Sequence, residues 1–209
     1  MQQLLRILLM LIIACTSIRY VQAQFDMGLP LIKNYKATDY NAQTQMWGAV
    51  QDSAGLVYFG NNDGVIVFTG RQWLKVPVAN RSIVRSLAVF RDTVFVGASN
   101  EFGFLEKSGN GQFVYQSISK QLPDTIMNFK NIHNIKNIEN HIYFITDHYI
   151  FDYHHGKISI IKSQIPLQLG AFTFDGELYM YLTGKGLGIL KNNQILPIPG
   201  SEQLISKGA

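Results

Sequence analysis

Two acidic residues with similar surroundings are the first candidates for chemistry in this sequence. Asp63 lies in Asn61-Asn62-Asp63-Gly64, and Glu101 ends Ser99-Asn100-Glu101; each segment follows a short apolar run. Carboxylates held side by side can exchange protons or bind a polar ligand. The same segments are also strong tight-turn sequences, which would explain them without a ligand. The candidate ligand-binding residues from these turns are Asn62, Asp63, Asn100 and Glu101, and we expect no catalytic residue among them.

Arg85 is the fifth candidate ligand-binding residue, because it stands between apolar neighbours, Val84 and Leu87. A guanidinium that faces inward can bind an anionic ligand through paired hydrogen bonds. Arg85 could equally pair with an acidic side chain and hold two sheets together. For Trp47 and Trp73 we expect core packing between sheets, with stacking on a sugar as the alternative.

The five histidines raise the question of a metal site. Their spacing matches no zinc signature. His154-His155-Gly156 is instead typical of a polar hairpin tip between two apolar runs. We therefore predict neither a metal site nor a cofactor. The histidines are His133, His141, His148, His154 and His155.

The stretch from Gln45 to Pro77 indicates which elements position these residues. It contains four short runs rich in Val, Tyr, Phe and Trp, separated by three segments in which Gly accompanies Asn, Asp, Ser or Thr. Such runs favour strands, and such separators favour tight turns. The pattern therefore predicts a four-stranded antiparallel meander.

The same pattern returns three times. The central strands of the units begin at Val57, Val94, Ile142 and Leu178, at intervals of about 40 residues, and an insertion around Leu122–Asn131 lengthens one interval. Four-stranded units at this period predict an all-β fold, an incomplete β-propeller of about four four-stranded blades. An all-β sandwich with regular turns is the alternative. The expected blades are residues 45–77, 82–118, 132–162 and 168–199, within a domain of residues 41–209.

Particular residues in the first two units carry a resemblance to a known family. The sequence is similar to the opening of the two-component regulator propellers of Bacteroidota, over roughly Leu31 to Lys162. Units three and four depart from the pattern, with Ile145 and Tyr181 where the family has Gly. The matching residues are Asn34-Tyr35, Tyr40, Gln45-Met46-Trp47, Gln51-Asp52, Gly55, Tyr58-Phe59-Gly60-Asn61, Gly64, Phe68, Gly70, Trp73, Val84-Arg85-Ser86-Leu87-Ala88, Gly97-Ala98 and Glu101-Phe102-Gly103.

The resemblance implies a periplasmic ligand sensor that is not itself an enzyme. In this family the propeller is usually followed by a triple-tyrosine domain, a transmembrane helix and an output module, either a histidine kinase or a helix-turn-helix regulator. The chain would then be an N-terminal fragment of a longer receptor, with a small molecule or oligosaccharide as ligand and a homodimer as one possible assembly. The alternatives are a secreted glycan-binding or scaffold propeller and a propeller lyase or hydrolase.

The N-terminal residues are typical of an export signal. Residues 1–23 contain the apolar run Ile7–Ala14 and predict cleavage between Ala23 and Gln24. Cys15, the only cysteine, offers lipidation as an alternative. We expect residues 24–40 to form an extended lead-in. The formal net charge is +4 without a basic cluster, which argues against nucleic-acid binding.

Overall fold

Each predicted unit forms one four-stranded antiparallel sheet in the computed structural model, which describes residues 3, 32–109, 111–126 and 128–207. The strands of each sheet follow chain order, from one edge to the other. We call the sheets blades one to four. Blade one holds β1 (Met46–Gln51), β2 (Val57–Asn61), β3 (Gly64–Phe68) and β4 (Trp73–Val76).

The other three blades repeat this order. Blade two holds β5 (Val84–Phe90), β6 (Thr93–Ala98), β7 (Glu101–Lys107) and β8 (Phe113–Ser117). Blade three holds β9 (Asn134–Ile138), β10 (His141–Ile145), β11 (Tyr149–His154) and β12 (Lys157–Lys162). Blade four holds β13 (Leu167–Phe174), β14 (Glu177–Leu182), β15 (Gly186–Lys191) and β16 (Gln194–Pro197). All four predicted central strands are confirmed.

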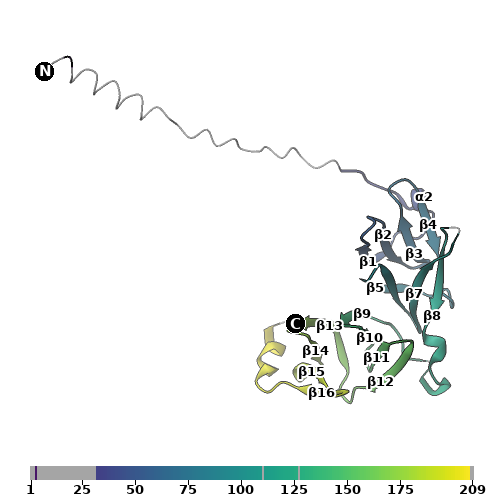
Figure 1. Cartoon of the computed structure of the whole chain (residues 1–209). Coiled ribbons are helices and arrows are strands. Elements are labelled where there is room, and N and C mark those ends of the chain that lie inside the picture. Colours follow the sequence, from purple (N-terminus) through teal and green to yellow (C-terminus); the bar gives the residue numbers. More distant parts are fainter. Residues whose placement is uncertain (1–2, 4–31, 110, 127, 208–209) are drawn as a thin grey trace. The chain divides into compact units, whose positions relative to one another are not determined.

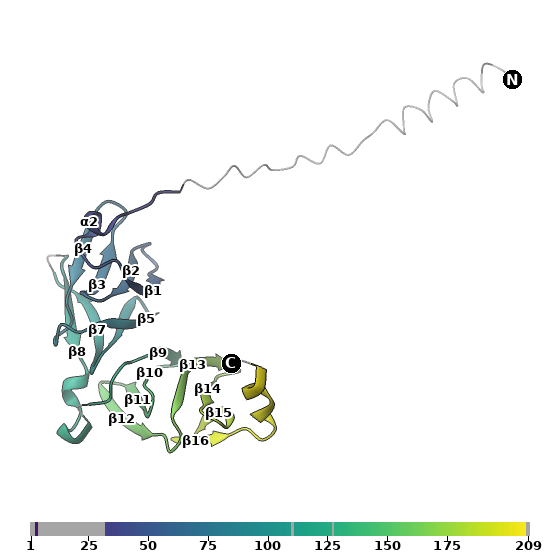
Figure 2. The same cartoon turned by 180° about the vertical axis from the view of Figure 1, so that it is seen from behind.

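The first strands of successive blades lie side by side. β1 contacts β5, β5 contacts β9 and β9 contacts β13, and the sheets follow one another in chain order (Figures 1 and 2). Stacked four-stranded sheets whose first strands share an inner edge are propeller-like blades. The sandwich alternative requires two packed sheets, so it does not fit these four.

Apolar side chains fill the space between neighbouring blades. In β14 they alternate with half-buried or exposed residues, and Leu178, Met180 and Leu182 are buried. Other strands, such as β3 and β6, are buried at almost every position. Between blades two and three the rings of Phe102 and Phe151 stack with centroids 5.0 Å apart. Strands with one buried face therefore show the two-residue period, whereas strands covered on both faces do not.

Two glycines allow neighbouring blades to approach closely. A Cβ on Gly60 would lie 3.0 Å from the carbonyl oxygen of Val84 in blade two. A Cβ on Gly97 would lie 2.5 Å from Cγ2 of Ile132, which leads into blade three. Glycine within a strand often marks such a close backbone approach. These positions therefore place β5 and the segment before β9 directly against the preceding blade.

We expected residues 24–40 to form an extended lead-in, but its last four residues are helical. Ala37–Tyr40 form a single-turn helix, α2. The Lys36 backbone N–H donates to Asp39 Oδ2 at 2.7 Å, and Asn41, in the left-handed region at φ 49°, ends the turn. A local hydrogen bond of this kind stabilises a turn that apolar patterning does not reveal.

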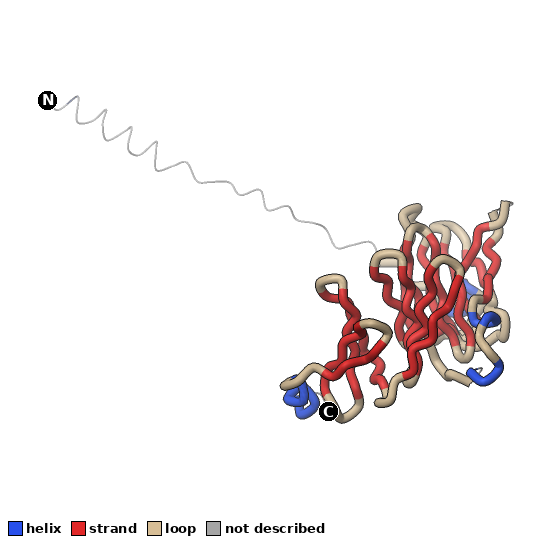
Figure 3. Tube along the Cα trace, turned by 60° about the horizontal axis from the view of Figure 1, so that its bottom comes forward, coloured by secondary structure: helices blue, strands red, loops and turns tan. Residues whose placement is uncertain are grey.

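The remaining short helical turns lie between and after the blades, as the colouring in Figure 3 shows. η1 (Ser119–Gln121) and η2 (Asp124–Ile126) occupy the insertion between blades two and three, and η3 (Ser201–Lys207) follows blade four. Tyr35–Ala209 make up one compact unit, which contains all four blades.

The predicted export signal, with Cys15, Ala23 and Gln24, lies outside the described residues. Within the part of the chain that the structure describes, no helix combines the length and apolar character needed to span a membrane.

Candidate functional site

Two strands at the inner edge carry a bulge at the same place. In β1 the pairing with β2 shifts between Met46 and Gly48, which leaves Trp47 without a partner residue. In β5 the pairing with β6 shifts in the same way around Arg85. A bulge re-aims the side chain of the extra residue. Trp47 and Arg85 are therefore both turned out of the regular alternation of their strands.

These two side chains meet. Cζ of Arg85 lies 3.7 Å from the centroid of the Trp47 ring. Trp47 Nε1 donates a hydrogen bond to Asn62 Oδ1 at 2.7 Å, and Trp47 is 41% exposed. Two predicted site residues, Arg85 and Asn62, are thus brought together by a residue that we expected in the core. That expectation for Trp47 is wrong because the bulge turns its ring toward solvent.

Trp73, in contrast, packs within blade one and against the lead-in, not between blades. Its ring contacts Phe68 at 4.5 Å and Phe59 at 5.8 Å between centroids. Tyr35 and Tyr40 contact it from the lead-in, at 5.1 and 5.5 Å. The two tryptophans therefore occupy different environments, one exposed and one among aromatic rings.

A polar network extends the site from Asn62 to Asp63. Asn62 Nδ2 donates to Gln43 Oε1 at 2.9 Å, and Gln43 Nε2 donates to Asp63 Oδ1 at 3.3 Å. Lys75 Nζ lies 3.8 Å from Asp63 Oδ2. Beneath them the buried Asn61 donates from Nδ2 to the Gln43 carbonyl oxygen at 2.6 Å. The amides of Asn62 and Gln43 are thus held in place at the solvent-exposed surface of blade one.

The surroundings of Arg85 do not support the alternative of an inter-blade ion pair. No ion pair of Arg85 occurs among the described residues, and its buried Nε has no hydrogen-bond partner there. The guanidinium instead lies over Trp47, a cation–π arrangement. An arginine that stacks on a ring keeps the N–H groups in its plane available for carboxylate or sulfate oxygens.

Glu101 does not join this site. It is 6% exposed, and its Oε1 accepts hydrogen bonds from Tyr115 Oη at 3.0 Å, Ser117 Oγ at 2.8 Å and Ser119 Oγ at 2.5 Å. Burial and the nearby carboxylate raise the pKa of Tyr115 well above its ordinary value. Asp63 and Glu101 are therefore not held side by side as a pair of carboxylates.

The reason lies in the strand register. The pairing places Asn100 at the position of Asp63, and Glu101 at that of Gly64. A shift of one residue turns a side chain to the opposite face of a sheet. Asn100 contacts the insertion between blades two and three, because its Oδ1 accepts a hydrogen bond from the Lys130 backbone N–H at 2.6 Å. Val57 and Val94 begin equivalent strands. Asp63 is the sixth residue after Val57, whereas Glu101 is the seventh after Val94, so the sequence itself contains this shift.

Trp47 and Arg85 belong to a row of equivalent side chains at the inner edge of successive blades, which we call the inner row. The sequence analysis did not recognise His133 as its third member. The backbone N–H of His133 donates to the Ile145 carbonyl oxygen at 2.9 Å, so His133, just before β9, corresponds to Arg85 and Trp47. Its Nε2 lies 2.9 Å from Asp147 Oδ1. The repeat itself carried this signal, because His133 follows the buried Ile132 as Arg85 follows the buried Val84.

His141 and His154 lie close together in blade three. His141 Nδ1 lies 2.8 and 3.0 Å from the two carboxylate oxygens of Asp152, and its ring lies 3.9 Å from that of His154. His155 and Gly156 both have positive φ, which confirms the predicted hairpin tip. Within residues 32–109, 111–126 and 128–207 no three histidine, cysteine or acidic side chains are placed to hold a metal.

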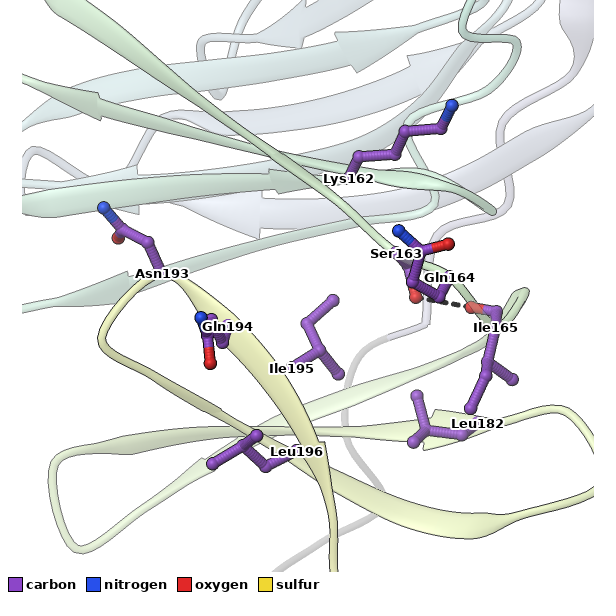
Figure 4. A pocket seen from close by; sticks show the side chains of 9 residues that line it. All are labelled: Lys162, Ser163, Gln164, Ile165, Leu182, Asn193, Gln194, Ile195 and Leu196. Carbon is purple, nitrogen blue, oxygen red and sulfur yellow. Dashed lines mark hydrogen bonds between the residues drawn. The ribbon is translucent and has the colours of Figure 1, made fainter.

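A cavity beside β16 offers less chemistry. Its volume is about 310 Å³, and Figure 4 shows the side chains of Ile165, Leu182 and Ile195 that line it together with several amides and Lys162. In this view Ser163 Oγ is occupied by a hydrogen bond to the Ile165 carbonyl oxygen. Neither an acid nor an aromatic ring lines it. The inner row with Trp47 and Arg85 is therefore a stronger candidate site than this cavity.

Comparisons with known proteins give a likeness of fold. No protein-family model and no curated protein matches the sequence. The extracellular domain of a one component system from B. thetaiotaomicron matches 74% of this chain with a TM-score of 0.50 at 15% identity. The extracellular domain of a hybrid two component system from the same organism matches 79% with a TM-score of 0.48 at 13% identity.

The chain spans only 21% and 29% of these two structures. At this identity the likeness concerns the fold alone. The four blades are therefore similar in fold to part of the extracellular domain of a one component system.

Proposed function

We propose that this chain is the extracytoplasmic ligand-sensing part of a two-component type regulator, exported to the periplasm. The observation that carries the proposal is the exposed Trp47 ring, held between the Arg85 guanidinium and the Asn62 amide. An exposed aromatic ring flanked by fixed polar groups is a common way to bind a small organic ligand or sugar. The fold likeness and the export signal support the location.

The fold that we propose is an incomplete propeller, part of a longer receptor. One face of blade four exposes large apolar side chains, among them Phe174 at 68% and Leu196 at 44%. Between blades two and three, in contrast, Phe95 and Phe144 are buried against each other. Exposed apolar surface of this kind marks an interaction site, and a further blade would cover it as its neighbours are covered.

In this proposal the segment has no catalytic activity. Ligand bound at the inner row would favour one arrangement of the receptor over another, and only a difference in affinity between the two can pass the signal on. The signal would go to a triple-tyrosine domain and then to a kinase or helix-turn-helix output, in a homodimeric full-length receptor.

Tryptophan fluorescence tests the site directly, since the chain contains only two tryptophans. Trp47 is exposed at the site, whereas Trp73 lies among aromatic rings. We expect an oligosaccharide panel to contain a ligand that changes the emission of the 209-residue chain. Trp47→Phe should remove that change and weaken binding in calorimetry, while Trp73 still reports an intact fold.

A ligand that binds Trp47→Phe and the original chain with equal affinity would refute this site. A reporter gene driven by the full-length receptor tests sensing itself. Binding without any change in reporter output would favour the alternative, a glycan-binding or scaffold propeller.

A further inference from the structure

In blades one and three the inner side chain is satisfied by its own blade. Trp47 bonds to Asn62 at 2.7 Å, and His133 bonds to Asp147 at 2.9 Å. Asn62 and Asp147 occupy the same place in the turns that join the second and third strands of these blades. Both blades therefore follow one rule, by which the inner side chain pairs with the turn beside it.

Arg85 breaks this rule. The equivalent turn residue in blade two is Ser99, whose hydroxyl donates to Asn131 Oδ1 instead. Within the described part of the chain, Arg85 makes no ion pair and its buried Nε has no partner. A buried donor without an acceptor is costly, and the guanidinium keeps its charge at any ordinary pH.

The acidic groups of the neighbouring turns contact other side chains. Asp63 receives a hydrogen bond from Gln43 and lies 3.8 Å from Lys75 Nζ. Asp147 contacts His133. Arg85 therefore carries a positive charge that forms no ion pair with a carboxylate of the described residues.

We infer that the ligand of this site is an acidic sugar, whose carboxylate or sulfate binds Arg85 while its ring packs on Trp47. The inference rests on the proposed function and adds the charge of the ligand to it. A planar guanidinium can bind two oxygens of such a group at once. The amides of Asn62 and Gln43, which hydrogen-bond to each other, lie beside the ring and can exchange bonds with sugar hydroxyls.

Matched pairs of charged and neutral sugars test the inference on the 209-residue chain. The pairs are trigalacturonate with its methyl ester and glucose 6-sulfate with glucose, and sodium sulfate serves as the bare ion. We expect at least one charged sugar to bind at least about tenfold more tightly than its neutral partner, as one charge-assisted hydrogen bond would give. The preferred pair shows whether a carboxylate or a sulfate is recognised.

Arg85→Met keeps a long side chain over Trp47 but removes the charge. It should abolish the preference for the charged sugar, and Arg85→Lys should restore part of it. Arg71→Met, in the exposed turn between β3 and β4, is the matched control and should leave binding unchanged. Circular dichroism of each variant checks the fold.

The inference is overturned if no charged sugar binds, if the charged preference survives in Arg85→Met, or if sodium sulfate alone binds as tightly as the sugars. A neutral oligosaccharide whose binding needs Trp47 but not Arg85 would also overturn it. That last result would leave the proposed function intact, so the two failures can be told apart.

Discussion

The turns between the second and third strands of blades one and two have the same place in the repeat but opposite roles. In blade one, Asp63 has a side chain that is 31% exposed and joins a surface network of amides. In blade two, Glu101 is 6% exposed beneath three hydroxyl groups. The difference comes from a shift of one residue along equivalent strands.

The comparison shows that equivalent turns of a repeat can place one acidic residue at the surface and another in the core. Backbone pairing is common to both blades, so each acid is placed by its register alone. One position lies at the surface, where its carboxylate can contact a ligand. The other points to the last strand of its blade and the start of η1, where the carboxylate accepts hydrogen bonds from Tyr115, Ser117 and Ser119.

The largest expected effect is the loss of the buried carboxylate. Glu101→Ala leaves one buried and two half-buried hydroxyls without their acceptor, and we expect a loss of about 3 kcal/mol in the free energy of unfolding. Asp63→Ala, the matched change in blade one, should cost no more than about 0.5 kcal/mol. Urea unfolding of both variants measures the difference, and equal losses would contradict the comparison.

Substitution of the glycine just before each turn should likewise cost more stability in blade two than in blade one. Gly97→Ala places a Cβ 2.5 Å from Ile132 Cγ2, and we expect a cost of about 1–3 kcal/mol from overpacking. Gly60→Ala meets the Val84 carbonyl oxygen at 3.0 Å, so its cost should be smaller. Thermal unfolding ranks the two, and a larger loss for Gly60→Ala would show that blade one is the tighter.

The buried cluster of blade two should also make stability depend on alkaline pH. The raised pKa of Tyr115 favours the protonated phenol in the folded state. Its contribution is fully present below the unfolded tyrosine pKa of about 10 and is lost as the pH rises above it. Tyr115→Phe should remove about 1 kcal/mol of the loss in unfolding free energy between pH 10 and 11. An unchanged slope would mean that Tyr115 ionises without unfolding.

The smallest effect on stability should come from the network of blade one. Asn62→Ala removes the acceptor of the exposed Trp47 N–H, so unfolding should change by less than about 0.5 kcal/mol. Binding of a ligand on Trp47 should nevertheless weaken severalfold in calorimetry, because the ring loses its anchor. Unchanged binding would separate Asn62 from the site.

Much of the fold could be predicted from the sequence because the signals are local. The Gly-containing turns and the apolar runs around Val57, Val94, Ile142 and Leu178 located the central strand of all four blades. The tip at His155-Gly156 was equally readable, since both residues adopt positive φ. The single turn of α2 was not, because one side-chain hydrogen bond near Asp39 decides it.

Only part of the site could be predicted from the sequence, and the reason is physical. Residue types alone selected Arg85 and Asn62, but a bulge depends on how two strands pair, and neither strand records it by itself. The bulges turned Trp47 outward and brought Arg85 over its ring, across two blades. Register likewise sent Glu101 into the core. The sequence by itself determined the strands, the turns and their repetition; the tertiary structure decided which side chains meet, because side-chain direction follows from pairing between distant segments.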